Sequence, residues 1–280
     1  MKLQLLNLVT LFLLAIGFSQ NALSITAMAS GVSSSTFQSI KKEAESGNAE
    51  AQVALAVMYM QGEGVDPSPK KAVRWLSEAA DAGRSDAQHA LGTMFDNGYA
   101  VRQNYKDAFP WFNKAAKSGF ASSQDMLGIY YRNGTGVNKN FRLAIKWFKK
   151  AAKQGHPNAQ NNLGWAYSKG QGTSKDYKKA VKWFRKAADQ NHARAQNNLA
   201  LAYERGRGVS KNLKESVYWY RESAVQGHAN AQNNLALCYE NGTGVLKDYE
   251  RALYWYQKSV DGGNFKARRN MKKLQKIMKL

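Results

Sequence analysis

The sequence predicts an all-α solenoid, because two residue types recur with one strict period and a pair of glycines that can end a helix occurs in most of the periods. Tryptophan and glutamine both return every 36 residues, and no insertion breaks the phase. The positions are Trp75, Trp111, Trp147, Trp183, Trp219 and Trp255, with Gln52, Gln88, Gln124, Gln160, Gln196 and Gln232. A period of about 20–50 residues indicates repeats that bury an apolar face against their neighbours. We therefore expect six 36-residue helix-turn-helix repeats over residues 48–263, a half repeat at 37–47 and a capping helix at 264–280.

Each repeat carries the signals of two helices. In the first helix, apolar residues four positions apart share one face, as Ala159, Leu163 and Tyr167 do. A glycine pair such as Gly170 and Gly172 then ends that helix. The second helix begins at residues whose side chains can accept hydrogen bonds from free backbone N–H groups. These residues are Ser68, Asn104, Asn140, Asp176, Asn212 and Asp248.

The second repeat departs from this pattern at two places. Ala100 replaces the second loop glycine, and Pro110 lies well inside the second helix. An interior proline removes a backbone hydrogen bond, kinks the helix and costs about 3 kcal/mol. In the fourth repeat Asn191 takes the place of the terminal glycine, because asparagine tolerates a left-handed backbone. We expect the array to be least regular around the second and third repeats.

The N-terminus predicts export. A basic start precedes an apolar run from Leu3 to Phe18, and small residues follow up to Ala29. This pattern is typical of a secretory signal peptide over residues 1–29, and the run is too short for a membrane span. Ala22-Leu23-Ser24 is a second candidate cleavage site, and residues 30–36 are expected to be a linker. The sequence thus predicts a periplasmic or secreted protein of bacterial source without a transmembrane segment after signal removal.

The net charge indicates which classes of partner are favoured, and the cysteine count indicates whether a disulfide can form. The net charge is +21, and loss of Lys2 with the signal peptide leaves 21 − 1 = +20. Such a charge favours acidic proteins or an anionic envelope surface, and export makes nucleic acid an unlikely partner. Cys238 is the single cysteine, so no intramolecular disulfide can form, and its place in the repeat predicts buried packing.

The repeated motif carries a family resemblance. It reads Gly-x-x-x-Ala-Gln-x-x-Leu-Gly/Ala-x-x-Tyr, then Gly-x-Gly-Val, then Asp/Asn-x-x-x-Ala-x-x-Trp. From about Glu43 to the C-terminus it resembles the Sel-one-like repeats (SLR), relatives of the tetratricopeptide repeats. The resemblance implies an α/α superhelical solenoid that acts as an adaptor or scaffold, often one exported by bacteria.

The histidine and serine motifs of the sequence do not indicate a catalytic, cofactor or metal site. One repeat position is occupied by three histidines, His156, His192 and His228. A whole helix pair separates each of these histidines from the next, so they cannot share a metal ion. We expect them to be the residues at which helices start. Ser68-Pro69-Lys70-Lys71 satisfies Ser-x-x-Lys, but Ser68 belongs to the helix-start column and neither Ser-Asp-Asn nor Lys-Thr-Gly occurs. A β-lactam-hydrolysing or cell-wall-active enzyme, as linked with the cysteine-rich branch of SLR proteins, stays the alternative.

Two surfaces are the candidate binding sites of an exported, non-enzymatic and monomeric scaffold for a protein or peptide partner. At 100° per residue, a groove is expected opposite the core on the first helices of repeats four to six. Its residues are Asn161, Trp165, Ser168, Asn197, Leu201, Glu204, Asn233, Leu237 and Glu240. A convex basic ridge is expected from Arg142, Lys146, Lys149, Lys150, Lys178, Lys182, Arg185 and Lys186. The recurrent asparagines could instead record duplication of similar repeats, and the ridge could be an ordinary solvated face.

Overall fold

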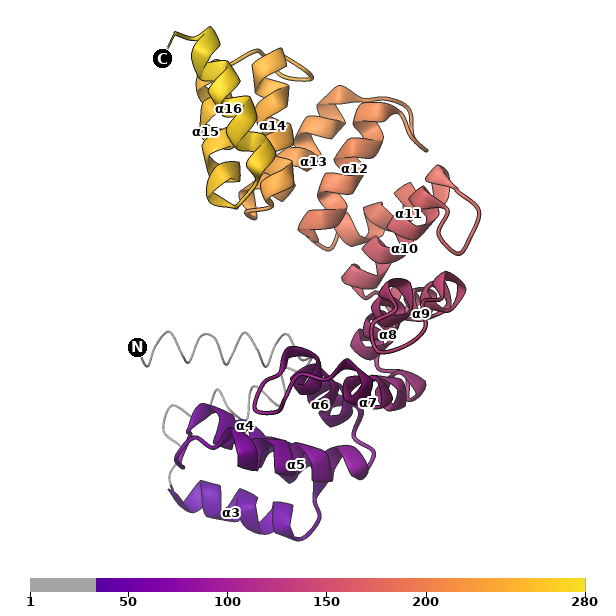
Figure 1. The fold of residues 1–280 in the computed structure, drawn as a ribbon, viewed down its shortest axis with the longest axis vertical. Helices are drawn as coiled ribbons and strands as arrows, with labels where there is room; N and C mark the ends of the chain where they lie inside the picture. Colours follow the sequence, from indigo (N-terminus) through magenta and orange to yellow (C-terminus); the bar gives the residue numbers. More distant parts are fainter. Residues whose placement is uncertain (1–33, 280) are drawn as a thin grey trace. The chain divides into compact units, whose positions relative to one another are not determined.

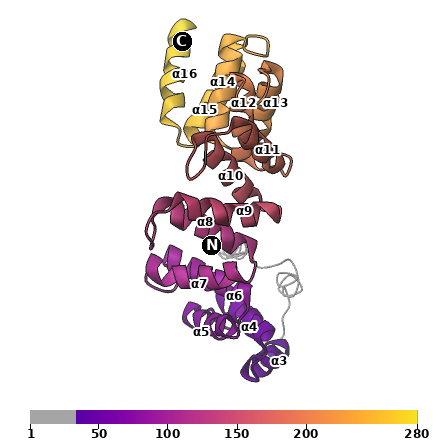
Figure 2. The same cartoon turned by 90° about the vertical axis from the view of Figure 1, so that its right-hand side faces the viewer.

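The computed structural model describes residues 34–279, which contain fourteen α-helices and no strand (Figures 1 and 2). In chain order they are α3 (Ser34–Glu45), α4 (Ala49–Gln61), α5 (Pro69–Asp81), α6 (Ser85–Asn97), α7 (Tyr105–Lys117), α8 (Ala121–Asn133), α9 (Phe141–Lys153), α10 (Pro157–Lys169), α11 (Tyr177–Ala188), α12 (Ala193–Arg205), α13 (Leu213–Val225), α14 (Ala229–Asn241), α15 (Tyr249–Asp261) and α16 (Phe265–Ile277). The predicted all-α solenoid of helix pairs is confirmed. The expected signal peptide lies outside the described residues, and α3 begins at Ser34, so the expected linker does not extend to residue 36.

The helices form two compact units, one up to Trp147 and one from Phe148 onward. Within each unit, helices consecutive in the chain pack side by side, as α4 with α5 and α10 with α11. The second unit holds the fourth repeat (α10 and α11), the fifth (α12 and α13), the sixth (α14 and α15) and the helix α16. Within a unit, each repeat therefore buries its apolar face against the repeats next to it in sequence.

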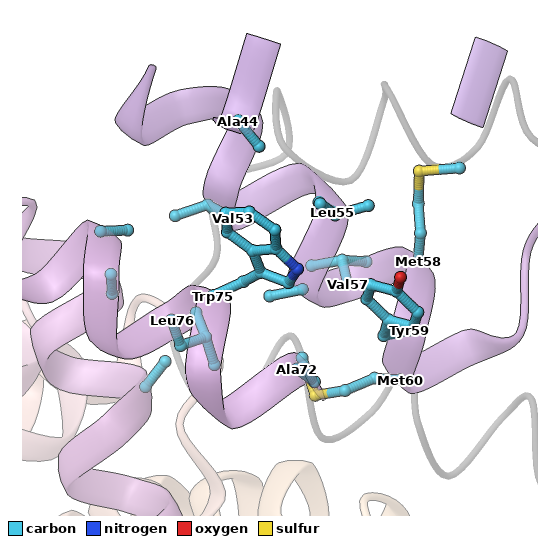
Figure 3. Close-up of a cluster of buried hydrophobic side chains, with 14 of the residues drawn as sticks. Ala44, Val53, Leu55, Val57, Met58, Tyr59, Met60, Ala72, Trp75 and Leu76 are labelled. Atoms are coloured by element: carbon cyan, nitrogen blue, oxygen red, sulfur yellow. The ribbon is translucent and has the colours of Figure 1, made fainter. Parts of the chain in front are cut away.

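Figure 3 shows the apolar cluster formed by α3, α4 and α5 of the first unit. Ala44, Leu55 and Trp75 each come from a different one of these helices and are 1%, 0% and 8% exposed. Burying a leucine side chain of this kind contributes about 1.5–3 kcal/mol. The predicted core stripe of the first helices is confirmed, because Ala159, Leu163 and Tyr167 are buried. The equivalent residues of the first and sixth repeats are buried as well: Ala51, Leu55, Tyr59, Ala231, Leu235 and Tyr239.

The structure explains the glutamine column. Gln196 is buried in α12, and its Nε2 donates to the carbonyl oxygen of Ala188 at the end of α11, 3.4 Å away. The equivalent bonds run from Gln52, Gln88, Gln124, Gln160 and Gln232 to Ala44, Ala80, Ala116, Ala152 and Ala224. The last carbonyls of a helix have no partner within that helix. Each of these carbonyls also accepts a hydrogen bond from the backbone N–H three residues later, as Ala188 does from Asn191 at 2.9 Å. Each glutamine therefore adds a second hydrogen bond to such a carbonyl and ties a first helix to the helix before it.

Most of the expected helix-start residues cap their helices. Asn104, Asn140, Asp176, Asn212 and Asp248 accept a hydrogen bond from a backbone N–H group of the first turn. Ser68 precedes α5 but makes no such side-chain bond, and Pro69 follows it in the first helical position. Asn191 has φ 62°, which confirms that it supplies the left-handed backbone of the glycines in its column.

The second loop glycine of a repeat faces two constraints. Gly208 has φ +77°, and a Cβ atom there would lie 2.2 Å from the carbonyl oxygen of Tyr177 at the start of α11. The same atom at Gly244 would lie 2.4 Å from the carbonyl oxygen of Leu213. At Gly208 and Gly244 the loop thus approaches the backbone of the preceding repeat too closely for a residue with a Cβ atom to fit without a shift of the backbone.

The second repeat is regular in length but strained at one residue. Pro110 lies inside α7, which has the same 13 residues as α6 and α8. Ala100, in the column of Gly208, adopts φ 59°. A residue with a Cβ atom in this left-handed region costs about 1–2 kcal/mol. Ala100 therefore keeps the left-handed backbone of the glycine column at the cost of local backbone strain.

Candidate functional site

A pocket of about 360 Å³ opens between α10, α11 and α12 in the second unit. Trp165 of α10, Phe184 of α11 and Leu201 of α12 supply its large apolar surfaces. The small side chains of Ser168 and Ala202 leave room between them. Trp165, Ser168 and Leu201 belong to the predicted groove, so the structure brings three of its nine residues together at one cavity.

Cations surround this pocket. Lys169, Lys175, Arg205 and Arg207 line it and are exposed, and no aspartate or glutamate is among its lining residues. Lys175 Nζ lies 5.0 Å from the ring centre of Tyr177, and the Arg207 guanidinium lies 5.5 Å from it. A hydrogen bond with Lys175, together with the positive charges of Arg207 and Lys169, lowers the pKa of Tyr177. The four lining cations make the mouth of the pocket a region of positive potential.

The prediction that the three groove asparagines face away from the core is wrong. Asn161, Asn197 and Asn233 are only 8%, 6% and 7% exposed. The Oδ1 atom of each accepts a bond from an asparagine Nδ2 in the next first helix: Asn198 at 2.9 Å, Asn234 at 3.1 Å and Asn270 at 3.0 Å. The side chains lie between adjacent first helices because repeats pack on both sides of each such helix, which a single-helix projection ignores. Their buried acceptors serve the stacking of repeats.

The two groove glutamates also have structural partners. Glu204 of α12 accepts a hydrogen bond from the Tyr220 hydroxyl of α13 at 3.2 Å, and Glu240 accepts one from Tyr256. Burial and the nearby carboxylate raise the pKa of both tyrosines. Leu237 is half-buried and lies outside the pocket lining. The part of the predicted groove around Trp165 and Leu201 is the part that lines the pocket.

The residues of the expected basic ridge are mostly exposed. Seven of them reach solvent: Arg142, Lys146, Lys149, Lys150, Lys178, Lys182 and Lys186. Arg185 is half-buried, donates to the Tyr203 hydroxyl and lies 5.9 Å from the Trp219 ring centre. Arg185 is therefore engaged between α11 and its neighbours, whereas the other side chains on these helices can meet a partner.

The Sel1 repeat matches the chain six times without overlap. The matched residues are 49–83, 85–120, 121–156, 157–192, 193–228 and 229–264. The chain belongs to the Sel1 repeat family. Proteins of this family are typically scaffolds for protein–protein interaction, and their fold is generally non-enzymatic.

Two solved structures of bacterial proteins resemble this one. One is c5321, a protective antigen of uropathogenic Escherichia coli strains with an SLR fold, at 37% identity and TM-score 0.77. The match covers 84% of this chain and 50% of that one, so this chain spans about half the length of the antigen. The other is a Sel1 repeat protein from Oxalobacter formigenes, at 28% identity and TM-score 0.77, with 86% and 97% of the two chains covered. None of the curated proteins matches this chain.

Across residues 34–279, no helix has the length and apolar character needed to cross a membrane.

Histidines cap the first helices of three Sel1 repeats, as expected for helix-start residues. Nδ1 of His156, His192 and His228 accepts a hydrogen bond from the backbone N–H of the third residue after it, at 3.4, 3.2 and 3.3 Å. His192 therefore carries its proton on Nε2, which donates to Asn158 Oδ1 at 2.8 Å. Burial lowers the pKa of all three rings, and Arg194 adds to the effect at His192 and His228.

These caps predict that stability falls in mild acid. The folded-state pKa of each ring lies below the unfolded value of about 6.5, so the unfolded chain binds protons first as the pH falls. The contribution is complete above that pH and is lost as pH drops from about 6.5 toward the lowered folded-state pKa. A protonated ring can no longer accept the N–H bond, and loss of such a cap costs about 1 kcal/mol. Melting temperatures measured from about pH 8 to about pH 5 check this expectation.

The chain itself supplies the matched control. Asn48 and Asn264 occupy the histidine position in other repeats and cap with a side-chain oxygen that does not titrate in this range. A triple variant with His156→Asn, His192→Asn and His228→Asn should keep its helices and lose much of this pH dependence. An unchanged pH profile in that variant would assign the effect to other groups.

The remaining reactive side chains are accounted for by packing. Cys238 is 4% exposed, and burial together with Glu204 raises its pKa to about 12, so the thiol stays protonated at neutral pH. The expectation of buried packing for Cys238 is confirmed. Within the described part of the chain, no three His, Cys, Asp or Glu side chains gather as a metal site would require.

Proposed function

We propose that this protein is an exported, monomeric and non-enzymatic Sel1 repeat scaffold that binds an acidic protein or peptide segment at the pocket between α10, α11 and α12. The observation that carries the proposal is the combination of an apolar floor with a rim of four cations. Trp165 and Leu201 offer apolar surface, and Lys169, Lys175, Arg205 and Arg207 offer charge to an anionic partner.

The rest of the chain is consistent with this role. A net charge of +21 raises the rate of encounter with acidic partners. The exposed cations of the basic ridge on α9 and α11 add a second contact, either to the same partner or to an anionic envelope surface. The apolar run near the N-terminus supports export, and the relative c5321 is itself a protective antigen.

Selection of random peptides displayed on phage, followed by affinity measurements on the enriched peptides, tests the proposal. Trp165→Ala and Lys175→Glu are each expected to weaken binding by about tenfold, because they remove the apolar floor and reverse a rim charge. Affinity should also fall as salt rises, since exposed charges are screened over about 8 Å at physiological ionic strength. Nitrocefin should not be hydrolysed by the purified protein.

The sixth repeat provides a matched control for the rim. Lys247 stands in the same repeat position as Lys175 and lies 4.6 Å from the ring centre of Tyr249, yet it is outside the pocket. Lys247→Glu changes the net charge equally and should leave the affinity nearly unchanged. Equal losses in both lysine variants would indicate a general charge effect, and failure to enrich any peptide would refute the proposed function.

A further inference from the structure

The first helices of three repeats carry a carboxylate at one position, and each of these carboxylates is bound to a tyrosine. Asp96 accepts a hydrogen bond from Tyr130 at 2.5 Å. Glu204 accepts from Tyr220 at 3.2 Å, and Glu240 accepts from Tyr256. In these repeats a carboxylate and a phenol together fill the space beside the second helix.

The fourth repeat has no carboxylate at this position, and neither of the two positions that supply the tyrosine elsewhere holds a tyrosine here. Ser168 stands at the carboxylate position, and its hydroxyl donates to the carbonyl oxygen of Trp165 at 2.8 Å. Phe184 stands where the fifth and sixth repeats have Tyr220 and Tyr256, and Ala202 stands where the third repeat has Tyr130. All three of these smaller or less polar side chains line the pocket. The cavity therefore lies where the second, fifth and sixth repeats hold a carboxylate of their own.

We infer that the pocket binds a peptide through a glutamate or aspartate side chain that enters the space left by Ser168, with an apolar side chain beside it on Trp165 and Leu201. This inference rests on the proposed function and names the class of ligand. Lys169 and Arg205 follow Ser168 and Glu204 directly in the sequence and line the same cavity. Lys169 supplies positive charge for a carboxylate that has no phenol partner, and Arg205 adds a cation that it shares with Glu204, whose Oε2 lies 4.0 Å from Arg205 Nε. No aspartate or glutamate is among the residues that line the pocket.

A double substitution tests the inference by introducing the carboxylate–tyrosine pair of the fifth and sixth repeats. Ser168→Glu with Phe184→Tyr introduces the residues that α12 and α13 already use, so the variant should fold with unchanged helicity and an equal or higher melting temperature. Its own carboxylate should occupy the pocket and weaken the enriched phage-display peptides by at least about tenfold. Ser168→Gln is the uncharged control of nearly equal size, and it should weaken binding less than Ser168→Glu does.

The peptides provide the complementary measurement. Replacement of their glutamate or aspartate by the corresponding amide should weaken binding to the wild-type protein by about tenfold, and should matter little for the double variant. The inference is overturned if the amide peptides bind the wild-type protein equally well, or if the folded double variant keeps full affinity. In either case the proposed function still stands provided that Trp165→Ala weakens the same peptides. Should the double variant fail to fold, the amide peptides and the single Ser168 variants decide the question.

Discussion

Gly208→Ala is expected to destabilise the second unit by about 3 kcal/mol or more, the largest effect that we predict for a single methyl group. The left-handed backbone at this residue accounts for about 1–2 kcal/mol of the cost. The remainder comes from the close approach, because the new Cβ atom would lie 2.2 Å from Tyr177 O and 2.4 Å from Tyr177 C. These are backbone atoms of α11 and cannot rotate away. The following or preceding helix must therefore shift.

Gly227→Ala is the matched control for this variant. Gly227 also has a positive φ, +85°, but a Cβ atom there would meet nothing within 4 Å. It should cost only about 1–2 kcal/mol, the backbone part of the penalty. Urea unfolding followed by circular dichroism compares the two, and equal midpoints would show that the loop can relax away from α11. Because Arg207 precedes Gly208 and lies over Tyr177, Gly208→Ala should also weaken peptide binding.

Asn197→Ala is expected to cost about 1–3 kcal/mol of stability, although its helix alone suggests a solvent-facing position. Asn197 is 6% exposed, and its Oδ1 accepts from Asn234 Nδ2 at 3.1 Å. Truncation leaves the amide of Asn234 without its partner between α12 and α14, and an unpaired buried polar group is costly. The loss should appear as a lower unfolding midpoint of the second unit.

A double-mutant cycle separates this bond from general loss of packing. Asn197→Ala combined with Asn234→Ala should cost less than the sum of the two single variants, since the bond between the two residues is lost only once. The bond that Asn233 Nδ2 donates to Asn234 Oδ1 at 3.4 Å is lost in both variants that lack Asn234, so its loss cancels in the cycle. Asn230→Ala is the control on the surface, because Asn230 is exposed where it accepts from Asn264 at 3.2 Å. It should change stability by no more than about 0.5 kcal/mol. Additive effects of Asn197→Ala and Asn234→Ala would contradict the pairing.

The periodic features of the sequence were sufficient to predict the architecture. Residues that act within one helix or turn, such as the caps Asp176 and Asn212 or the left-handed Asn191, were placed correctly because their roles depend on local backbone geometry. The sequence showed that glutamine recurs every 36 residues, but it did not show which group each glutamine bonds to. Gln196 bonds to Ala188 across a turn between two helices, and that partner emerges only when their packing is known.

The candidate site was predicted only in part for the same reason. Trp165 and Leu201 were expected on an open face and do line a pocket. Asn161 was assigned to that face by a helical projection that leaves out the adjacent α12, where Asn198 covers it. Phe184 and Arg207 were missed as members of the site, because they come from the second helix and the loop. Ser168 is the smallest side chain in the column that holds Asp96, Glu204 and Glu240, and this was a signal in the sequence that could have pointed to the cavity.

The nearest-neighbour packing of the helices also bears on how the chain folds. The asparagine bonds between repeats join residues only 37 positions apart, and the glutamine bonds join residues 8 apart. Loops of this length close at small entropic cost, and topologies rich in such local contacts fold fast. A repeat can therefore pack as soon as the repeat next to it in the sequence is free to fold, without waiting for the C-terminus.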